Sequence, residues 1–400
     1  MKIIVSADIG NSETKMITRY DGVEGSECFH QPSVIRKLIK SPQIAETNLK
    51  KNVINLDENL IAHITSSALN RHGDGLYVIG KKAMQTDLNK VQNMNIKLGN
   101  KHKHDIPVIM ILSMIARTVV KDEFELNGAL ESSYQIDCDF VSAIPASEFT
   151  FEKAKEFEKR LTKGDHTVVI HLGDKKIMVG INFKKAKITQ EGIPAIFAMV
   201  YDNEENGDRK VSLLDKFNEV YDEEMEPNDL LKMKIFHVDI GDGTTEYIYT
   251  NGVNPVIDAC DGERRGVGHA TEDAVIMLNE MLQGSFKSSR QSFMEIIKDK
   301  THNLHSEAFN ALEAAKGTQA NEILEDTFEK IQNKAGNSVD LITVYGGGSI
   351  QFREHLEESL RDYAETINSK LLWVPEELAV NLNVRGLDIL NRTVFSKNKK

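Results

Sequence analysis

The fold is decided by the stretch Asp239-Ile-Gly-Asp-Gly-Thr-Thr-Glu246. A second stretch near the N-terminus, Asp8-Ile-Gly-Asn-Ser-Glu-Thr-Lys15, has Asp, Ile, Gly and Thr at matching places. Each stretch follows a short apolar run that predicts a β-strand, and each leads into a predicted return strand. We therefore expect a β-hairpin with a turn of glycine and small polar residues at the start of each half of the chain.

Each turn has the composition of a phosphate-binding loop. Glycine and small polar residues let successive backbone N–H groups converge on an anion. One turn in each half can therefore hold a triphosphate, and Lys15 adds a positive charge for it. Either turn alone is also typical of an ordinary hairpin, so the inference depends on finding both in the same context. The predicted phosphate-binding residues are Gly10, Asn11, Ser12, Lys15, Gly241, Asp242, Gly243 and Thr244.

The acidic residue that begins each turn predicts a magnesium site. Asp8 and Asp239 both come at the end of an apolar strand. Mg²⁺ is a hard cation that keeps several of its waters when carboxylates bind it. We therefore expect Asp8 and Asp239 to hold Mg²⁺ through water, beside the phosphates.

A glycine-rich sequence, Val344-Tyr-Gly-Gly-Gly-Ser349, lies nearer the C-terminus. It joins a predicted buried strand over 341–345 to an amphipathic helix over 350–363. Glycines there let the backbone approach a flat ligand and leave a helix N-terminus free for an anion or a ribose oxygen. Such a turn is common in α/β proteins, so its position after the two phosphate turns is what makes Gly346, Gly347 and Gly348 candidate ligand-binding residues.

The order of phosphate turn, phosphate turn and glycine loop resembles the actin, Hsp70 and sugar-kinase superfamily, in which the third segment is the adenosine loop. The second turn, 239–246, is particularly similar to that of actin. Within the superfamily the chain more closely resembles ParM, the plasmid-partition actin, over most of its length. The segments that carry this resemblance are Ile144-Pro-Ala-Ser-Glu-Phe149, Glu191-Gly-Ile-Pro-Ala195, Asp261-Gly-Glu-Arg-Arg-Gly-Val267 and Asn383-Val-Arg-Gly386.

The resemblance implies an ATPase that uses Mg²⁺, with GTP as an alternative nucleotide. It places Glu191, between a strand and a helix, at the position of the carboxylate that orients the attacking water, with Asp8 and Asp239 completing the catalytic set. The plain alternative is an acidic residue favoured at a helix N-terminus. Glu148 is the nearest competitor, but its position after Ser147, the predicted N-cap of a helix ending near 161, fits a helix start better.

The resemblance also implies what the ATPase does. It implies a protein that assembles with itself into dynamic filaments and segregates plasmid DNA through a DNA-binding adaptor protein. Closed, ATP-bound subunits would join head to tail, and hydrolysis would weaken their contacts. An interface of this heterologous kind that does not close into a ring gives an open filament.

The predicted fold is α/β, an actin-like fold of two domains with ribonuclease H-like sheets flanked by helices and the nucleotide in the cleft between the domains. A length of 400 residues fits two domains better than one. Domain I is predicted over 1–203 plus 375–400, with a variable insertion at about 21–99. An acidic connecting segment covers 204–232, and domain II covers 233–374.

The composition excludes several classes of protein. A net charge of −12 argues against direct binding to nucleic-acid phosphates. Three scattered cysteines without a CxxC pair suggest neither a disulfide framework nor a zinc ribbon. The longest apolar stretch, 107–116, is too short to span a bilayer, so no membrane association is expected. We expect a cytoplasmic protein.

Two other functions share the same nucleotide site. A small-molecule kinase or phosphatase of the superfamily would need a substrate pocket with its own base, and no second carboxylate motif is evident in domain I. An Hsp70-like regulator is a further alternative, but no substrate-binding domain follows the nucleotide-binding part in this sequence.

Overall fold

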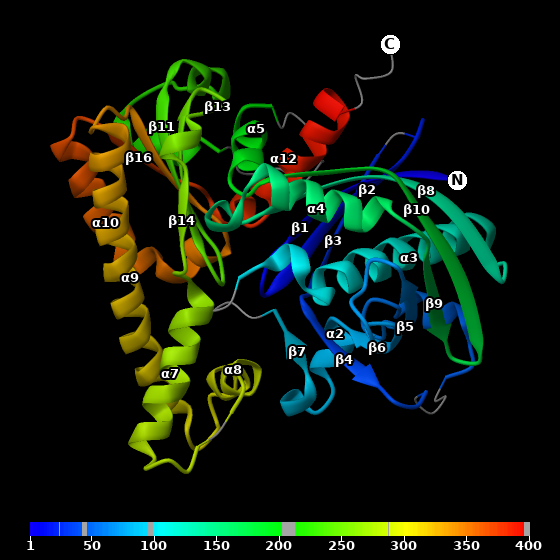
Figure 1. Cartoon of the computed structure of the whole chain (residues 1–400). Helices are drawn as coiled ribbons and strands as arrows, with labels where there is room; N and C mark the ends of the chain where they lie inside the picture. The colour runs from blue at the N-terminus through cyan, green and yellow to red at the C-terminus, as the bar shows by residue number, and fades with distance from the viewer. Residues whose placement is uncertain (24, 42–45, 95–98, 202–212, 287, 396–400) are drawn as a thin grey trace. The chain divides into compact units, whose positions relative to one another are not determined.

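A computed structural model describes residues 1–400 except 24, 42–45, 95–98, 202–212, 287 and 396–400 (Figure 1). The chain divides into two compact units. Unit 1 contains Met1–Ile144 and Phe149–Thr189. Unit 2 contains Pro145–Glu148 and Gln190–Lys400.

Unit 1 is built on a ten-stranded sheet with the order β3-β2-β1-β8-β10-β9-β5-β6-β4-β7. Strand β1 pairs antiparallel with β2 and parallel with β8. The predicted first hairpin is therefore confirmed, and it lies inside the sheet. The strands are β1 (Lys2–Ile9), β2 (Glu13–Tyr20), β3 (Glu27–Pro32), β4 (Val34–Leu38), β5 (Ile61–Ser66), β6 (Gly75–Ile79), β7 (Gln92–Asn93), β8 (Ser133–Ile144), β9 (His166–Leu172) and β10 (Lys175–Gln190).

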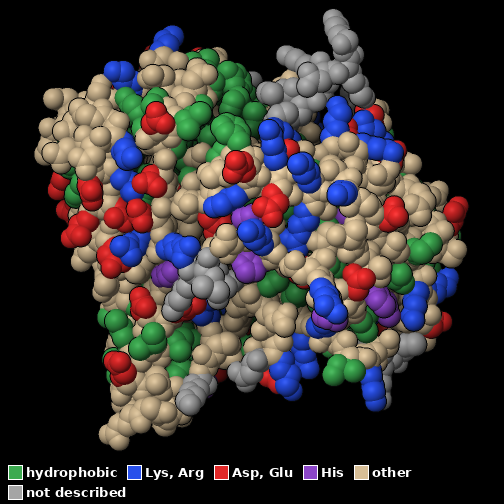
Figure 2. Space-filling model, viewed as in Figure 1, with side chains coloured by type: hydrophobic (Ala, Val, Ile, Leu, Met, Phe, Trp, Pro, Cys, Tyr) green, Lys and Arg blue, Asp and Glu red, His purple; other side chains and the backbone are tan. Residues whose placement is uncertain are grey.

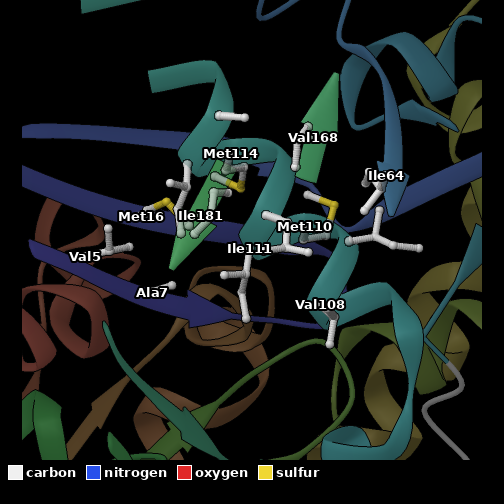
Figure 3. Close-up of a cluster of buried hydrophobic side chains, with 14 of the residues drawn as sticks. Val5, Ala7, Met16, Ile64, Val108, Met110, Ile111, Met114, Val168 and Ile181 are labelled. Atoms are coloured by element: carbon white, nitrogen blue, oxygen red, sulfur yellow. The ribbon is translucent and has the colours of Figure 1, made fainter. Parts of the chain in front are cut away.

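The core of unit 1 forms around one long helix. All fourteen residues from Pro107 to Val120 are buried, so this helix is enclosed on every side. Figure 3 shows its side chains packed among those of the sheet. The helices of unit 1 are α1 (Leu49–Ile54), α2 (Lys81–Met84), α3 (Asp105–Asn127), which contains the buried run, and α4 (Phe151–Thr162).

The segment 21–99, predicted as a variable insertion, is part of the sheet of unit 1. It supplies β3 beside β2, and β5, β6, β4 and β7 at the far edge. Most of its strands are short and separated by polar residues, so the apolar pattern of the sequence is too weak to predict most of them. The helix predicted to begin after Ser147 begins at Phe151 instead, because the Thr150 side chain accepts from the Lys153 backbone N–H.

Unit 2 repeats the strand arrangement of unit 1 around a six-stranded sheet. Its order is β13-β12-β11-β15-β16, with β14 also paired to β12. Strand β11 pairs antiparallel with β12 and parallel with β15, as β1 does with β2 and β8. The strands are β11 (Lys234–Ile240), β12 (Thr245–Asn251), β13 (Asn254–Pro255), β14 (Asp261–Glu263), β15 (Leu341–Tyr345) and β16 (Lys370–Trp373).

The sheet of unit 2 has a hydrophobic core on each face. Alternate residues of its strands enter one core or the other, for example Ile342 and Leu341 of β15. Helices α7, α9 and α10 contribute to the first core, and α5, α6, α11 and α12 to the second. The helices are α5 (Ile193–Tyr201), α6 (Asp215–Tyr221), α7 (Val267–Met281), α8 (Arg290–Lys298), α9 (His305–Ala335), α10 (Gly347–Thr366), α11 (Glu376–Ala379) and α12 (Leu382–Leu390).

The predicted domain boundaries differ from this division. Helix α5 belongs to unit 2, where it packs so closely on α12 that a Cβ at Gly386 would lie 1.6 Å from the Pro194 carbonyl oxygen. The described part of the acidic segment, 213–232, forms α6 and a 3₁₀ turn, and it buries Phe217 in the second core of unit 2. A 3₁₀ turn, Ile257–Ala259, lies between β13 and β14.

None of the described helices is long and apolar enough to cross a membrane.

A buried histidine predicts how the stability of unit 2 depends on pH. His237 of β11 is hydrogen-bonded to Thr250 Oγ1 (3.1 Å) and Thr343 Oγ1 (2.7 Å), and burial lowers its pKa to about 3. The unfolded chain, with a histidine pKa of about 6.5, therefore takes up a proton that the folded state excludes. This stability is present above pH 6.5 and is lost as the pH falls, by about 2 kcal/mol at pH 5.

Urea unfolding followed by the fluorescence of the single tryptophan, Trp373 of β16, measures this effect. His237→Gln is expected to be less stable at pH 7 but to lose less stability between pH 6.5 and pH 5 than the wild type. Equal losses in the two proteins would show that His237 does not carry the effect.

Candidate nucleotide-binding site

The turn between β1 and β2 is fixed by hydrogen bonds from Ser33, the residue between β3 and β4. Asp8 and Lys15 are cross-strand partners, and Lys15 Nζ lies 3.2 Å from Asp8 Oδ2. Ser33 Oγ donates to the Gly10 carbonyl oxygen (2.6 Å), and Ser33 N donates to the Ser12 carbonyl oxygen (2.8 Å). A Cβ at Gly10 would lie 2.7 Å from the Glu13 carbonyl oxygen, so the turn requires glycine there. The carbonyl oxygens of Gly10 and Ser12 therefore accept hydrogen bonds from Ser33.

The backbone N–H groups of the same turn remain available. Within the described part of the chain, those of Gly10, Asn11 and Ser12 donate to no other group. Consecutive free N–H groups in a turn form an anion-binding concavity. Together with Lys15, they suit a phosphate.

The turn between β11 and β12 is held in a similar way by helix α7. Gly241 N donates to the Thr244 carbonyl oxygen (2.9 Å), and Gly268 N of α7 donates to the Asp242 carbonyl oxygen (2.8 Å). Arg290 Nη1 lies 3.0 Å from Asp242 Oδ2. The N–H groups of residues 242–244 donate to no other group among the described residues. Each unit therefore has one fixed turn whose N–H groups are free.

The glycine triplet packs against the acidic residue of the second turn. Asp239 is 6% exposed, and Asn383 Nδ2 donates to its Oδ2 at 2.7 Å. Gly346 has a φ of +88°, and a Cβ there would lie 2.4 Å from Asp239 Oδ1. A Cβ at Gly348 would lie 2.8 Å from the Gly241 carbonyl oxygen. The predicted loop is shorter than expected, since β15 ends at residue 345 and α10 already begins at Gly347.

Glu191 lies between β10 and α5, as the sequence predicted. Its neighbour Gly192 has a φ of +81° and is held from two sides. Gly192 N donates to Asn383 Oδ1 (3.2 Å), and Tyr345 Oη donates to the Gly192 carbonyl oxygen (3.3 Å). The Asn383 amide therefore binds both Asp239 and the residue next to Glu191, and it fixes the two acidic positions within unit 2.

A further carboxyl group, Glu246, lies beside these two. It is 2% exposed and is the cross-strand partner of Asp239. Its Oε2 accepts a hydrogen bond from Ala146 N at 2.8 Å. Burial, followed by the negative charges of Glu191 and Asp239, raises the pKa of Glu246 well above its ordinary value.

Solved structures with similar folds include actin-like and ParM proteins. The actin-like protein Alp7A has 17% identity and a TM-score of 0.64, covering 100% of this chain and 98% of that one. A 15-stranded ParM filament from Clostridium botulinum has 15% identity and a TM-score of 0.66, covering 98% and 99%. Bacillus thuringiensis ParM with ATP has 15% identity and a TM-score of 0.57, covering 100% of both chains. No curated protein sequence matches significantly.

Two family models match consecutive parts of the chain. "Actin like proteins N terminal domain" matches residues 6–193, and "Archaeal actin homologue MreB-like, C-terminal" matches residues 237–358. The chain belongs to the actin-like protein superfamily. The first match in this actin-like chain includes the first turn and Glu191, and the second includes the second turn and the glycine triplet. The predicted α/β actin-like fold is confirmed.

The structure brings the predicted residues together in two groups. Asp8, Lys15 and the first turn lie in unit 1. Glu191, Asp239, the second turn and the glycine triplet lie in unit 2, so Glu191 belongs to a different unit from the one predicted. Glu148 lies in a 3₁₀ turn, Ala146–Glu148, and not in the first turn of α4. The helix-start explanation for Glu148 is therefore wrong.

Two residues of the second group in this actin-like chain were not predicted as site residues from the sequence. Asn383 was noticed only as part of a resembling segment, and Glu246 only as the last residue of the second turn. An acidic residue inside the fully buried run Thr245–Thr250 is the one signal that pointed to Glu246. Nothing in the local sequence distinguishes Asn383 from a solvent-exposed helical residue.

Proposed function

We propose that this chain is a polymerising, cytoplasmic actin-like ATPase that forms dynamic filaments and segregates plasmid DNA through a DNA-binding adaptor protein. The observation that carries the proposal is the repeated hairpin. Both units have an antiparallel pair with a parallel third strand, an acidic residue at the same register, and a turn with free N–H groups. Such a pair of turns suits the phosphates of a nucleotide, with ATP preferred and GTP an alternative.

The residues present fit Mg-ATP. The free N–H groups of residues 10–12 and 242–244 would donate to phosphate oxygens, and Lys15 would add its charge. Asp8 and Asp239 would hold Mg²⁺ through water, and Mg²⁺ there would neutralise phosphate charge. A side chain at position 346 would collide with Asp239, which explains why the sequence has glycine next to this acidic residue.

Glu191 is the proposed residue that orients the attacking water. The geometry supports this role because Asn383 and Tyr345 hold Gly192 in a left-handed conformation that fixes the backbone next to Glu191. Phosphoryl transfer depends chiefly on such positioning and on electrostatics.

Filament formation is supported by the full-length structural similarity to a ParM filament subunit. In the proposed mechanism, ATP-bound subunits assemble head to tail and hydrolysis weakens their contacts. Acidic and basic side chains are interspersed on the visible face in Figure 2, and the net charge is −12. Binding to DNA through an adaptor protein is therefore favoured over direct binding.

Right-angle light scattering with Mg-ATP, Mg-ADP and a non-hydrolysable analogue tests the proposal, with a pelleting check. We expect scattering that rises with Mg-ATP and then decays, a stable signal with the analogue, and little signal with Mg-ADP. ATP turnover without scattering at any nucleotide state would contradict filament formation and favour a small-molecule kinase or phosphatase. Neither scattering nor turnover would overturn the whole proposal.

A further inference from the structure

Three chain segments of unit 2 meet at the carboxyl group of Glu246. Strand β12 carries it, strand β14 pairs with β12 so that Gly262 lies opposite it, and Ala146 donates its backbone N–H to it. A Cβ at Gly262 would lie 2.3 Å from Glu246 Oε2 and 2.9 Å from Ser147 N. Glycine at position 262 therefore leaves the space in which the carboxyl group and the backbone of residues 146–147 come together.

The segment held in this way has an unusual place in the chain. Residues 145–148 follow β8 and precede α4, both of which belong to unit 1, but these four residues themselves belong to unit 2. We call Pro145–Glu148 the crossover segment. Its attachment to unit 2 includes the Ala146–Glu246 hydrogen bond, in which the acceptor is a side chain that is 2% exposed.

The other side of the same carboxyl group faces the candidate catalytic residues. Glu246 Oε1 is buried and has no hydrogen-bond partner of ordinary geometry in the described chain, although the Thr244 hydroxyl lies close enough to lower the pKa of Glu246. The charges of Glu191 and Asp239 are close enough to raise that pKa. One side chain is thus in contact with the crossover segment and adjacent to both acidic positions.

We propose that Glu246 is a positioning residue that fastens the crossover segment beside Glu191 and Asp239. The proposed consequence for catalysis rests on the proposed ATP hydrolysis, whereas the fastening itself does not. Losing the acceptor releases the Ala146 N–H and leaves a cavity beside Asp239, the cross-strand partner of Glu246, so the packing that supports the acidic positions is loosened. A displacement of about 1 Å at such a site can lower the rate about 10²-fold.

Three variants distinguish the hydrogen-bond acceptor of Glu246 from its ionisable carboxyl group. Glu246→Gln keeps an oxygen that accepts from Ala146 N, Glu246→Ala removes it, and Gly262→Ala places a methyl group where the carboxyl group lies. Glu357→Ala is the matched control, because Glu357 of α10 forms ion pairs with Arg353 and Arg361 and takes no part in the site.

Hydrogen exchange followed by mass spectrometry tests the fastening without nucleotide. Amides of residues 146–149 are expected to exchange about tenfold faster in Glu246→Ala and Gly262→Ala, and at the wild-type rate in Glu246→Gln and Glu357→Ala. Unchanged exchange in both Glu246→Ala and Gly262→Ala would overturn the proposal. If Glu246→Ala does not fold, Gly262→Ala and Glu246→Gln still decide the outcome.

Steady-state ATP hydrolysis tests the consequence. The kcat of Glu246→Ala is expected to fall at least tenfold with KM within threefold, and that of Glu246→Gln to stay within threefold of the wild type. A kcat for Glu246→Ala equal to that of the wild type would overturn the positioning role, as would equal losses in the alanine and glutamine variants. A wild type that does not hydrolyse ATP would instead contradict the proposed function, and the exchange result would still stand.

Discussion

Replacing Glu191 by alanine is expected to lower the kcat of ATP hydrolysis by about 10²- to 10³-fold, because positioned acid–base groups contribute on this scale. The proposed phosphate contacts come from backbone N–H groups of the two turns and from Lys15, so the affinity for ATP is expected to stay within about threefold. Filaments of the variant then form with Mg-ATP but do not disassemble. Phosphate release, measured in parallel with light scattering, gives both results from one sample.

Glu148→Ala is the informative control for this variant. Glu148 was the nearest competitor in the sequence, and it lies in unit 2 within a short 3₁₀ turn. We expect its hydrolysis rate to stay within about threefold of the wild-type rate. A large loss in Glu148→Ala together with a small loss in Glu191→Ala would transfer the water-orienting role to Glu148.

The sequence predicted those parts of the fold that depend on local patterns. The strand 341–345 has the predicted bounds, because its apolar run is limited by glycine at residue 346. The two hairpins were found because their turns require glycine at positions 10 and 241, where a Cβ would approach a backbone oxygen. Local steric demands of this kind are visible in the sequence itself.

The remaining features depend on contacts between distant segments. Asn383 is functional only because α12 brings it to Asp239, 144 residues earlier in the chain. The pKa of Glu246 is raised because the surrounding strands bury it, and the negative charges of Glu191 and Asp239 add to that effect. The acidic segment 213–232 looked like a linker because its apolar residues, such as Phe217 and Leu230, are few and widely spaced, yet they fill a core. No local pattern specifies these outcomes.

Replacing Gly346 by alanine is expected to weaken ATP binding at least tenfold and to destabilise unit 2 by about 2–4 kcal/mol. A left-handed φ alone costs a residue with a Cβ about 1–2 kcal/mol. The new Cβ would also lie 2.4 Å from both Asp239 Oδ1 and the Ile240 carbonyl oxygen, so the acidic residue of the second turn must move. Urea unfolding followed by Trp373 fluorescence gives the stability, and titration with a fluorescent ATP analogue gives the affinity.

Gly347→Ala, one residue further along, separates steric collision from a general loss of flexibility. A Cβ at Gly347 meets no atom within 4 Å, and this residue already lies in the first turn of α10. Alanine favours a helix over glycine by up to about 1 kcal/mol, so the unfolding midpoint of this variant is expected to equal or exceed that of the wild type. If both variants lose stability equally, the collision with Asp239 is not the cause. If Gly346→Ala loses stability but binds ATP normally, the glycine triplet serves packing and not the nucleotide.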